Sequence, residues 1–386
     1  MRQFELLDQA RAEHRLTLIV EDHGAGSPAD RRALTTLWPD VRIEPSPDSP
    51  VGSPQVAGRE PEMARWRKRV RQLRADLDPD RSSVRPYRNP ATVEAVSRVV
   101  AEHVDLFEVE YVQMFRYLPP ARQAPVVLVA LDVLGQRDPR AAGVEGAAQH
   151  VDLGDRRALR HEANAIRSAD AVIVTGDHER RAAEAAGARR VFVVPNGADD
   201  ALLDVAVGGP SERLLFVGWA GHTPNRDALG WWVDKVAPRL PEGTALDVVG
   251  AGWEGFTDDP RIRLLGFVDD MGGVLAGALV VVPLRVGGGT KLKVAEAMAA
   301  GRPIVLTSIA AEGLPIRDGR EAIVRDTPEG IAAAIAEVRA EPELRARLGQ
   351  AAREAARPLL WSAIRPQMEP VYEDLVRART AGTPLA

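Results

Sequence analysis

The chain alternates short, mainly apolar runs with longer segments in which apolar residues recur at helical spacing. Runs at residues 16–20, 126–130, 171–174 and 191–194 form a first series, and runs at residues 214–217, 245–249, 262–265 and 279–282 form a second. Strands that alternate with helices favour parallel sheets covered on both faces. The pattern predicts two doubly wound α/β domains that meet near residue 200. Ligands are expected at the carboxyl ends of their strands, in the cleft between the domains.

One stretch of the second series carries candidate chemistry. The apolar run 278–282 leads to three consecutive glycines, Gly287, Gly288 and Gly289, and a helix is predicted over residues 291–300 before a further strand at 304–306. Glycines let a ligand approach the backbone closely, and the first turn of a helix offers unpaired N–H groups and a positive dipole end. The stretch therefore predicts an anion site, with phosphate as its usual ligand.

Charged residues of the predicted helix refine this picture. Lys291 and Lys293 are about 200° apart on a regular helix, so we expect one to face phosphate and the other to face solvent. Thr290 is a plausible N-cap that could equally serve the phosphates. Glu296 is a lone carboxylate on an apolar helix, so it needs either sugar hydroxyls or a salt bridge to a neighbour such as Arg302. A site for phosphate next to a site for sugar hydroxyls predicts that the ligand is a nucleotide. The spacing of the glycines matches neither the P-loop nor the GxGxxG motif.

The stretch GGGTKLKVAEAMAAGRPIV, followed by TSIAAEGL, resembles the donor segment of glycosyltransferase family 4, the retaining GT-B enzymes. Three further segments resemble that family: Phe216-Val217-Gly218 with PNRDAL at residues 224–229, VPNGAD at 194–199, and DGREAI at 318–323. The resemblance is specific over roughly residues 155–330 and weak over the first 150.

The resemblance implies a GT-B fold of two Rossmann-like domains and transfer of a sugar from a nucleotide-diphosphate donor, with retention and without a metal. It implies an acceptor-side domain over residues 1–198, a donor domain over 199–360 and a C-terminal helix over 361–386 that packs back toward the first domain. The donor-binding residues it implies are Gly218, Arg226, Gly287, Gly288, Gly289, Thr290, Lys291, Leu292 and Glu296. The family motif places a basic residue at Lys293, which we assign to catalysis with Asp132. Glu296 matches the glutamate that binds the ribose hydroxyls.

The chain departs from the family pattern at three places in its candidate site. Gly288 stands where many members carry the first glutamate of a pair, which contacts the transferred sugar. Trp219 stands in place of a diphosphate-binding arginine, for which Arg226 or Arg285 could compensate. In the same loop, the purely structural interpretation of Asn225 is a helix N-cap. Asp132 lacks a neighbouring histidine and could simply cap its loop.

The start of the chain also departs from the family. Residues 1–13 predict a helix, whereas relatives open with a strand and a glycine turn. Either the true start lies upstream of Met1 or the first domain lacks its first strand. His161 and Glu162 match a further family segment, and a lone histidine of this kind is more often structural.

Composition limits the alternatives. A net charge of −5 and a pI near 5.9 argue against a nucleic-acid binder, and the absence of cysteine excludes disulfides and thiolate chemistry. No apolar run reaches the roughly 18 residues of a membrane span and no signal peptide opens the chain, which favours a cytoplasmic protein. Residues 62–78 form a basic amphipathic segment that predicts either peripheral contact with an anionic inner membrane face or a helix covering a domain.

Two other function classes remain open at this stage. The missing paired glutamate favours a catalytically silent GT-B binding subunit, and the same donor cradle would suit a GT-B sugar-nucleotide epimerase. An epimerase would release product without an acceptor. The acceptor of a transferase would be a glycan, a lipid-linked sugar or a small molecule, and the sequence identifies neither it nor the base and sugar of the donor.

Overall fold

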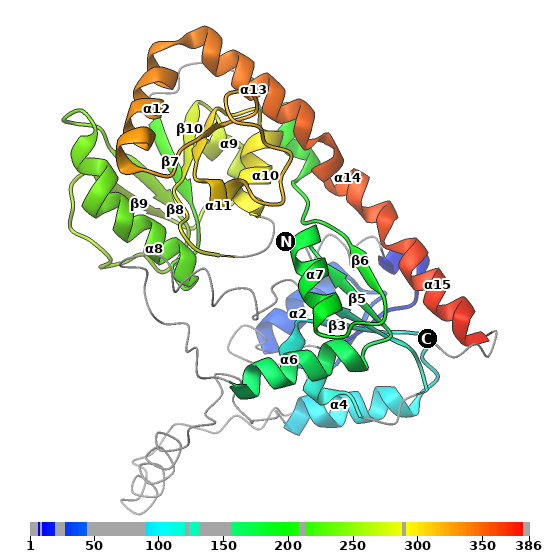
Figure 1. Ribbon diagram of the computed structural model, residues 1–386. Helices are drawn as coiled ribbons and strands as arrows, with labels where there is room; N and C mark the ends of the chain where they lie inside the picture. Colours follow the sequence, from blue (N-terminus) through cyan, green and yellow to red (C-terminus); the bar gives the residue numbers. More distant parts are fainter. Residues whose placement is uncertain are drawn as a thin grey trace, which may run out of the picture.

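A computed structural model describes residues 7, 10–19, 28–44, 90–119, 123–130, 156–207, 213–287 and 291–380. These residues form two parallel α/β units, one above the other in the view of Figure 1, and confirm the predicted fold class. No helix in these ranges combines the length and the apolar character needed to cross a bilayer. Residues 62–78, Asp132, Gly288, Gly289 and Thr290 lie outside them.

The first domain contains two separate parallel ladders in its described part. One pairs β1 (Thr17–Ile19) with β2 (Arg42–Glu44), and helical residues 10–13 precede it. The other has the order β3 (Phe107–Glu110), β4 (Val126–Val129), β5 (Ala171–Val174) and β6 (Val191–Val193). Its helical elements are α2 (Pro28–Leu37), α4 (Pro90–Ala101), η1 (Val112–Tyr117), α6 (Arg156–Ser168) and α7 (Asp177–Ala185).

The second domain is built on a six-stranded parallel sheet. Its strands are β7 (Arg213–Val217), β8 (Leu246–Val249), β9 (Ile262–Gly266), β10 (Ala278–Val282), β11 (Ile304–Leu306) and β12 (Ile323–Val324), in the order β12-β11-β10-β7-β8-β9. Its helices include α8 (Thr223–Trp231), α9 (Met271–Leu275), α10 (Leu292–Ala299), α11 (Ser308–Ala311), α12 (Pro328–Ala340) and α13 (Pro342–Ala356). Short η elements span Asp200–Asp204, Trp232–Val236, Ala237–Arg239 and Arg357–Leu359.

The predicted strands of the second series are therefore confirmed, and so is the glycine-loop helix. The helix that follows β7 is irregular. It starts at Thr223, and after Trp231 it continues as a π-helical turn and then a 3-10 turn that ends at Arg239. Trp232 is buried at the start of the π turn, so packing of this large side chain accompanies the change in helical geometry.

The last helices of the chain pack on the first domain. α14 (Trp361–Ile364), a 3-10 turn (Arg365–Gln367) and α15 (Glu369–Thr380) leave the second domain and run alongside the four-stranded sheet of the first domain (Figure 1). Side chains alternate between the faces of a strand. One face of the four-stranded sheet accordingly packs on α6, α7 and η1, while Val127, Val129 and Ile173 on the other face share a core with Val371 and Leu375 of α15. The tail thus completes the core of the first domain.

Candidate functional site

The candidate site lies where the winding of the six-stranded sheet reverses. β7 pairs with β8 on one side and with β10 on the other, so the chain winds outward in both directions from β7 and β10. In open α/β sheets the crevice outside such a reversal binds ligands. β7 continues into Gly218, and the loop after β10 passes Gly287 before α10 begins at Leu292. The candidate glycines of the two segments therefore stand at the same edge of the sheet.

Lys293, in the first turn of α10, places its ammonium between these two loops. Its Nζ donates to Asn225 Oδ1 over 2.5 Å and lies 4.5 Å from the centroid of the Phe216 ring. The residue as a whole is only partly buried. Loss of hydration nevertheless lowers the pKa of Lys293 to about 7, and the nearby Glu296 carboxylate opposes the shift.

Glu296 lies one helical turn further along α10 and is buried. Burial raises the pKa of Glu296 to about 7; Lys293 opposes this shift and Asp199 adds to it. The salt bridge to Arg302 that the sequence left open is not formed. Arg302 instead donates to the carbonyls of Ala278 and Ala206, each over 3.1 Å, and so fastens the helix end to the sheet and to the interdomain segment. The structure thus leaves Glu296 at the crevice rather than in an ion pair with Arg302.

Lys291 does not face solvent, which corrects one expectation. It is the N-cap residue of α10, is only 6% exposed, and brings its Nζ within 3.9 Å of a Glu312 carboxylate oxygen. Because Lys291 precedes the first helical residue, the 200° separation of a regular helix does not apply to it. Two lysines therefore lie near the start of α10, one opposite a carboxylate and the other on the neutral Asn225.

The loop after β7 corrects a second expectation, because Asn225 is not an N-cap. His222 holds that position, and Asn225 lies inside α8 and is buried. Its Nδ2 donates to the carbonyl of Trp219 over 2.9 Å, which leaves Oδ1 directed at Lys293. The sequence analysis missed this role of Asn225. Its side chain reaches α10 only because β7 and β10 are neighbours, and no local signal reports that pairing.

Gly218 is required sterically at this point. A Cβ there would lie 2.7 Å from the Asn225 amide and 2.9 Å from Lys293 Nζ. The Gly218 carbonyl accepts from Trp253 Nε1 over 2.7 Å, and a Cβ on Gly250 would approach it to 2.1 Å. The loops after β7 and β8 are thus fixed against each other beside the lysine.

The two arginines considered as substitutes for the family's diphosphate-binding arginine have other contacts. Arg285 pairs with the buried Asp227 at 2.5 Å, and its guanidinium lies 5.6 Å from the Trp231 ring centroid. Arg226 lies over Phe256, 5.0 Å from its centroid. Arg285 therefore has an acidic partner in the protein, whereas Lys293 is held by a neutral amide.

Two residues of the first domain have unusual surroundings, His161 on α6 and Tyr111 after β3. His161 Nε2 lies 3.2 Å from the Val112 carbonyl, and burial together with Arg116 keeps the pKa of this histidine below its usual value despite that hydrogen bond. Its contact joins α6 to η1, which suits a structural role. Tyr111 follows β3 with φ 68° and is 42% exposed. Left-handed backbone of this kind is uncommon for a bulky residue.

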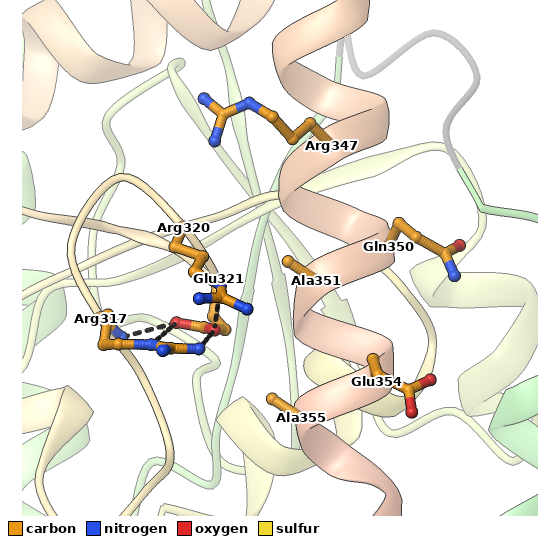
Figure 2. Close-up of a pocket in the computed structure, with 8 residues that line it drawn as sticks. All are labelled: Arg317, Arg320, Glu321, Arg347, Gln350, Ala351, Glu354 and Ala355. Carbon is orange, nitrogen blue, oxygen red and sulfur yellow. Dashed lines mark hydrogen bonds and ion pairs between the residues drawn. The ribbon is translucent and has the colours of Figure 1, made fainter.

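A separate cavity of about 440 Å³ lies between α13 and the loop before β12 (Figure 2). Arg317 and Arg320 from the loop both reach Glu321, and Arg347 of α13 donates to the Gly319 carbonyl over 2.8 Å. Burial opposes ionisation of Glu321, but hydrogen bonds from Arg317 hold its pKa below the usual value. The ion pairs lie within the loop, and the hydrogen bond from Arg347 fastens the loop to the helix.

Within the described ranges, one group of side chains has metal-ligand spacing. Atoms of Glu13, His14 and Glu369 lie within 4.8 Å of one another, with His14 Nε2 2.9 Å from a Glu369 oxygen. Glu13 and His14 are exposed, and the group joins the first residues of the chain to α15 rather than lining the crevice. It is explained by a hydrogen bond between these segments.

Comparison with known proteins adds to this geometry. Residues 211–341, which contain Gly218, Asn225, Lys293 and Glu296, match the family model of the glycosyl transferases group 1. D-inositol 3-phosphate glycosyltransferase of Nocardiopsis dassonvillei is 28% identical over 249 residues, which cover 55% of this chain and 58% of that protein. The match thus spans somewhat over half the length of the curated relative. Together these matches support a glycosyl transferases group 1 family.

Solved structures share the architecture over most of the chain. Anabaena HepE in complex with UDP-glucose aligns over 97% of this chain and 96% of its own, with a TM-score of 0.64 and 18% identity. Sucrose-phosphate synthase from Thermosynechococcus elongatus aligns over 75% of this chain and 78% of its own, with a TM-score of 0.62 and 20% identity. A glycosyltransferase from Rickettsia africae aligns over 97% and 95%, with a TM-score of 0.58 and 11% identity. The fold is that of the two-domain GT-B glycosyltransferases.

Proposed function

We propose that this chain transfers a sugar from a nucleotide-diphosphate donor to an acceptor hydroxyl. One observation carries the proposal: the reversal point of the donor-side sheet brings together Gly218, the start of α10 with Lys293, and Glu296. A phosphate-binding helix start beside a buried carboxylate matches the two halves of a nucleotide. The family match over residues 211–341 and the UDP-glucose complex of HepE support the donor class.

Each residue has a distinct part in the proposed reaction. The bond between the anomeric carbon and the diphosphate oxygen breaks, and its electron pair leaves on the diphosphate. The acceptor oxygen bonds the anomeric carbon, and its proton passes to an oxygen of the departing diphosphate. Lys293 and the amides at the start of α10 stabilise the growing negative charge, which is the part of such a reaction that preorganised groups accelerate most. Glu296 accepts hydrogen bonds from the ribose hydroxyls and so orients the donor.

The remaining features of the proposal extend this scheme. Retention, independence from divalent metal and binding of the acceptor by the first domain follow from the family resemblance, and Asp132 would face the cleft from that domain. With Gly288 in place of the paired glutamate, backbone amides of the glycine loop would contact the transferred sugar.

Ligand-dependent stabilisation tests the donor site. A ligand that binds only the folded protein raises its stability by about 2.7 kcal/mol at a hundredfold excess over Kd. We expect at least one of UDP, GDP, ADP and TDP to raise the Tm in the presence of EDTA, whereas the corresponding nucleosides should have little effect because they lack the diphosphate. If saturating amounts of all four diphosphates leave the Tm unchanged, the donor-site proposal is wrong.

A further inference from the structure

The ammonium of Lys293 is held by neutral groups. Its hydrogen bond goes to the Asn225 amide oxygen at 2.5 Å, and the face of the Phe216 ring lies on another side with its centroid at 4.5 Å. Both partners attract a cation, the ring through its quadrupole, yet neither carries a charge that could cancel the charge of the lysine. Phe216 and Asn225 are themselves buried, so this arrangement belongs to the packed interior of the domain.

The orientation of the Asn225 amide is fixed from its far side. Its Nδ2 donates to the Trp219 carbonyl over 2.9 Å, so the opposite end of the amide must present oxygen to Lys293. Its backbone N–H donates to the carbonyl of His222 at the helix start. Gly218 leaves the space that both side chains occupy, because a Cβ there would meet the Asn225 amide at 2.7 Å.

The acidic groups around this lysine have different surroundings. Glu296 on the same helix is itself buried and is influenced by Asp199. On α8, Asp227 is paired with Arg285 at 2.5 Å, and Glu312 stands 3.9 Å from Lys291. An aspartate in place of Asn225 would bring a carboxylate into direct contact with the Lys293 ammonium.

We propose that Asn225 is a positioning residue that holds the Lys293 ammonium toward the donor diphosphate while leaving its charge uncompensated. This inference rests on the proposed function and adds a residue to it. A neutral acceptor fixes the position of the cation, and an anionic ligand then supplies the opposite charge. The amide thereby separates two tasks that a carboxylate would combine, orientation and charge neutralisation.

Binding of nucleoside diphosphate as a function of pH tests this role. The probe is whichever of UDP, GDP, ADP and TDP binds the wild-type chain most tightly, titrated calorimetrically between about pH 7 and pH 9.5, where phosphate (second pKa about 6) stays dianionic. With the pKa of free Lys293 at about 7, wild-type affinity should fall by about tenfold in all as the pH rises through this range and the lysine loses its charge. Lys293→Met should bind more weakly and lose this dependence.

Asn225→Asp keeps the size of the side chain and adds the charge. An opposite charge in contact raises a lysine pKa by about one to three units, so the fall in affinity should start about one unit higher. Affinity near pH 7 should itself drop by about tenfold, because the carboxylate competes with the phosphates for the same ammonium. Asn164→Asp is the matched control. It adds the same charge at an exposed site on α6 and should bind like wild type.

Asn225→Ala keeps the inference testable if Asn225→Asp does not fold. It removes the acceptor without adding charge, and loss of a hydrogen bond to a charged group should weaken binding by about tenfold. The inference is overturned if Asn225→Asp keeps the wild-type pH dependence, if Asn225→Ala binds like wild type, or if Asn164→Asp loses as much affinity as Asn225→Asp. A wild-type chain that binds none of the four diphosphates would instead refute the proposed function.

Discussion

Lys293 and Glu296 stand one helical turn apart on α10, and the surroundings of each disfavour its charged form. Desolvation lowers the pKa of Lys293 to about 7 and raises the pKa of Glu296 to about 7. The attraction between the two opposite charges offsets these shifts only in part. Perturbed pairs of this kind are common at functional sites. An arriving diphosphate would restore the charge of the lysine.

Lys293→Met should reduce turnover more than donor affinity. In the wild type, the contact of Lys293 with the diphosphate strengthens as the sugar–phosphate bond breaks. Interactions that are stronger in the transition state raise kcat. Loss of one such preorganised donor lowers kcat by roughly 10²-fold. Steady-state kinetics with a nucleotide sugar would measure both constants.

Lys291→Met is the matched comparison, because Lys291 stands opposite Glu312 and would contribute less to the reacting phosphate. We therefore expect a smaller loss of kcat. Equal losses at the two positions would indicate a diffuse electrostatic effect. A loss confined to Lys291→Met would show that Lys291, and not Lys293, stabilises the leaving group.

Glu296→Gln should weaken nucleotide binding and stabilise the protein above neutral pH. Because burial raises the pKa of Glu296 from 4.5 to about 7, the folded chain holds this proton more tightly than the unfolded chain. The stability that the protonated carboxyl contributes is complete below pH 4.5 and is lost as the pH rises through about 7. Glutamine does not titrate, so the variant should gain up to ~3 kcal/mol over wild type at about pH 8.

Urea unfolding at about pH 4.5 and pH 8 would measure the difference in the free energy of unfolding. Glu337→Gln on the exposed side of α12 is the control and should show no such change with pH. Nucleotide affinity of Glu296→Gln should fall by about tenfold, because a charged acceptor is lost. A variant that is less stable than wild type at both pH values would contradict the assignment of Glu296 to the ligand.

At the scale of elements, the site depends on the close approach of the loop after β7 to the first turn of α10. Gly218 is the point of closest contact, since its missing side chain makes room for Asn225 and Lys293. The two elements are brought together by the ladder between β7 and β10, in which Leu214 is paired with Leu279.

Gly218→Ala should therefore impair the site by displacing both side chains. Overpacking of this kind costs about 1–3 kcal/mol of stability, and nucleotide binding should weaken as the lysine moves. Gly230→Ala on α8 is the matched control. A Cβ at Gly230 meets nothing within 4 Å, and alanine favours a helix over glycine by about 1 kcal/mol. Calorimetric titration and chemical unfolding of both variants would test this, and wild-type binding by Gly218→Ala would contradict it.

At the scale of the whole molecule, the tail of the chain ties the two domains together. Trp361 is buried in the core that α14 and α15 share with β4 and β5, and its ring lies against Gly197 in the interdomain segment. A backbone bridge between Ala198 and Leu360 lies beside it. The position of the first domain is thus tied to residues more than 150 positions away in the sequence.

Trp361→Ala should destabilise the first domain by about 3–5 kcal/mol, because it opens a cavity in that core. The second domain has a separate core, so donor binding by the variant should be retained under conditions where it remains folded. Trp219→Ala, at a tryptophan that is 62% exposed, should change stability by about 0.5 kcal/mol or less. Chemical unfolding followed by tryptophan fluorescence would measure both, and equal effects would refute the role of Trp361.

The sequence by itself determined the elements and the region of the site. Continuous apolar runs located β7 and β10, since strands buried on both faces must be continuously apolar. The glycine loop and Glu296 became candidates for a similar reason, because a glycine-flanked helix start and a lone carboxylate in an apolar helix are local properties. The preference for Lys293 over Lys291 came from the family motif.

Only the tertiary structure decided which side chains meet. Asn225 was predicted as an N-cap and Lys291 as a solvated charge, because local preference was the only guide available. The Asn225 side chain contacts Lys293, 68 positions away, only because β7 and β10 are adjacent in the sheet. Burial, and with it the pKa of Lys293 and Glu296, also depends on packing of the whole domain. Local sequence encodes propensity and pattern, whereas strand order brings distant residues into contact.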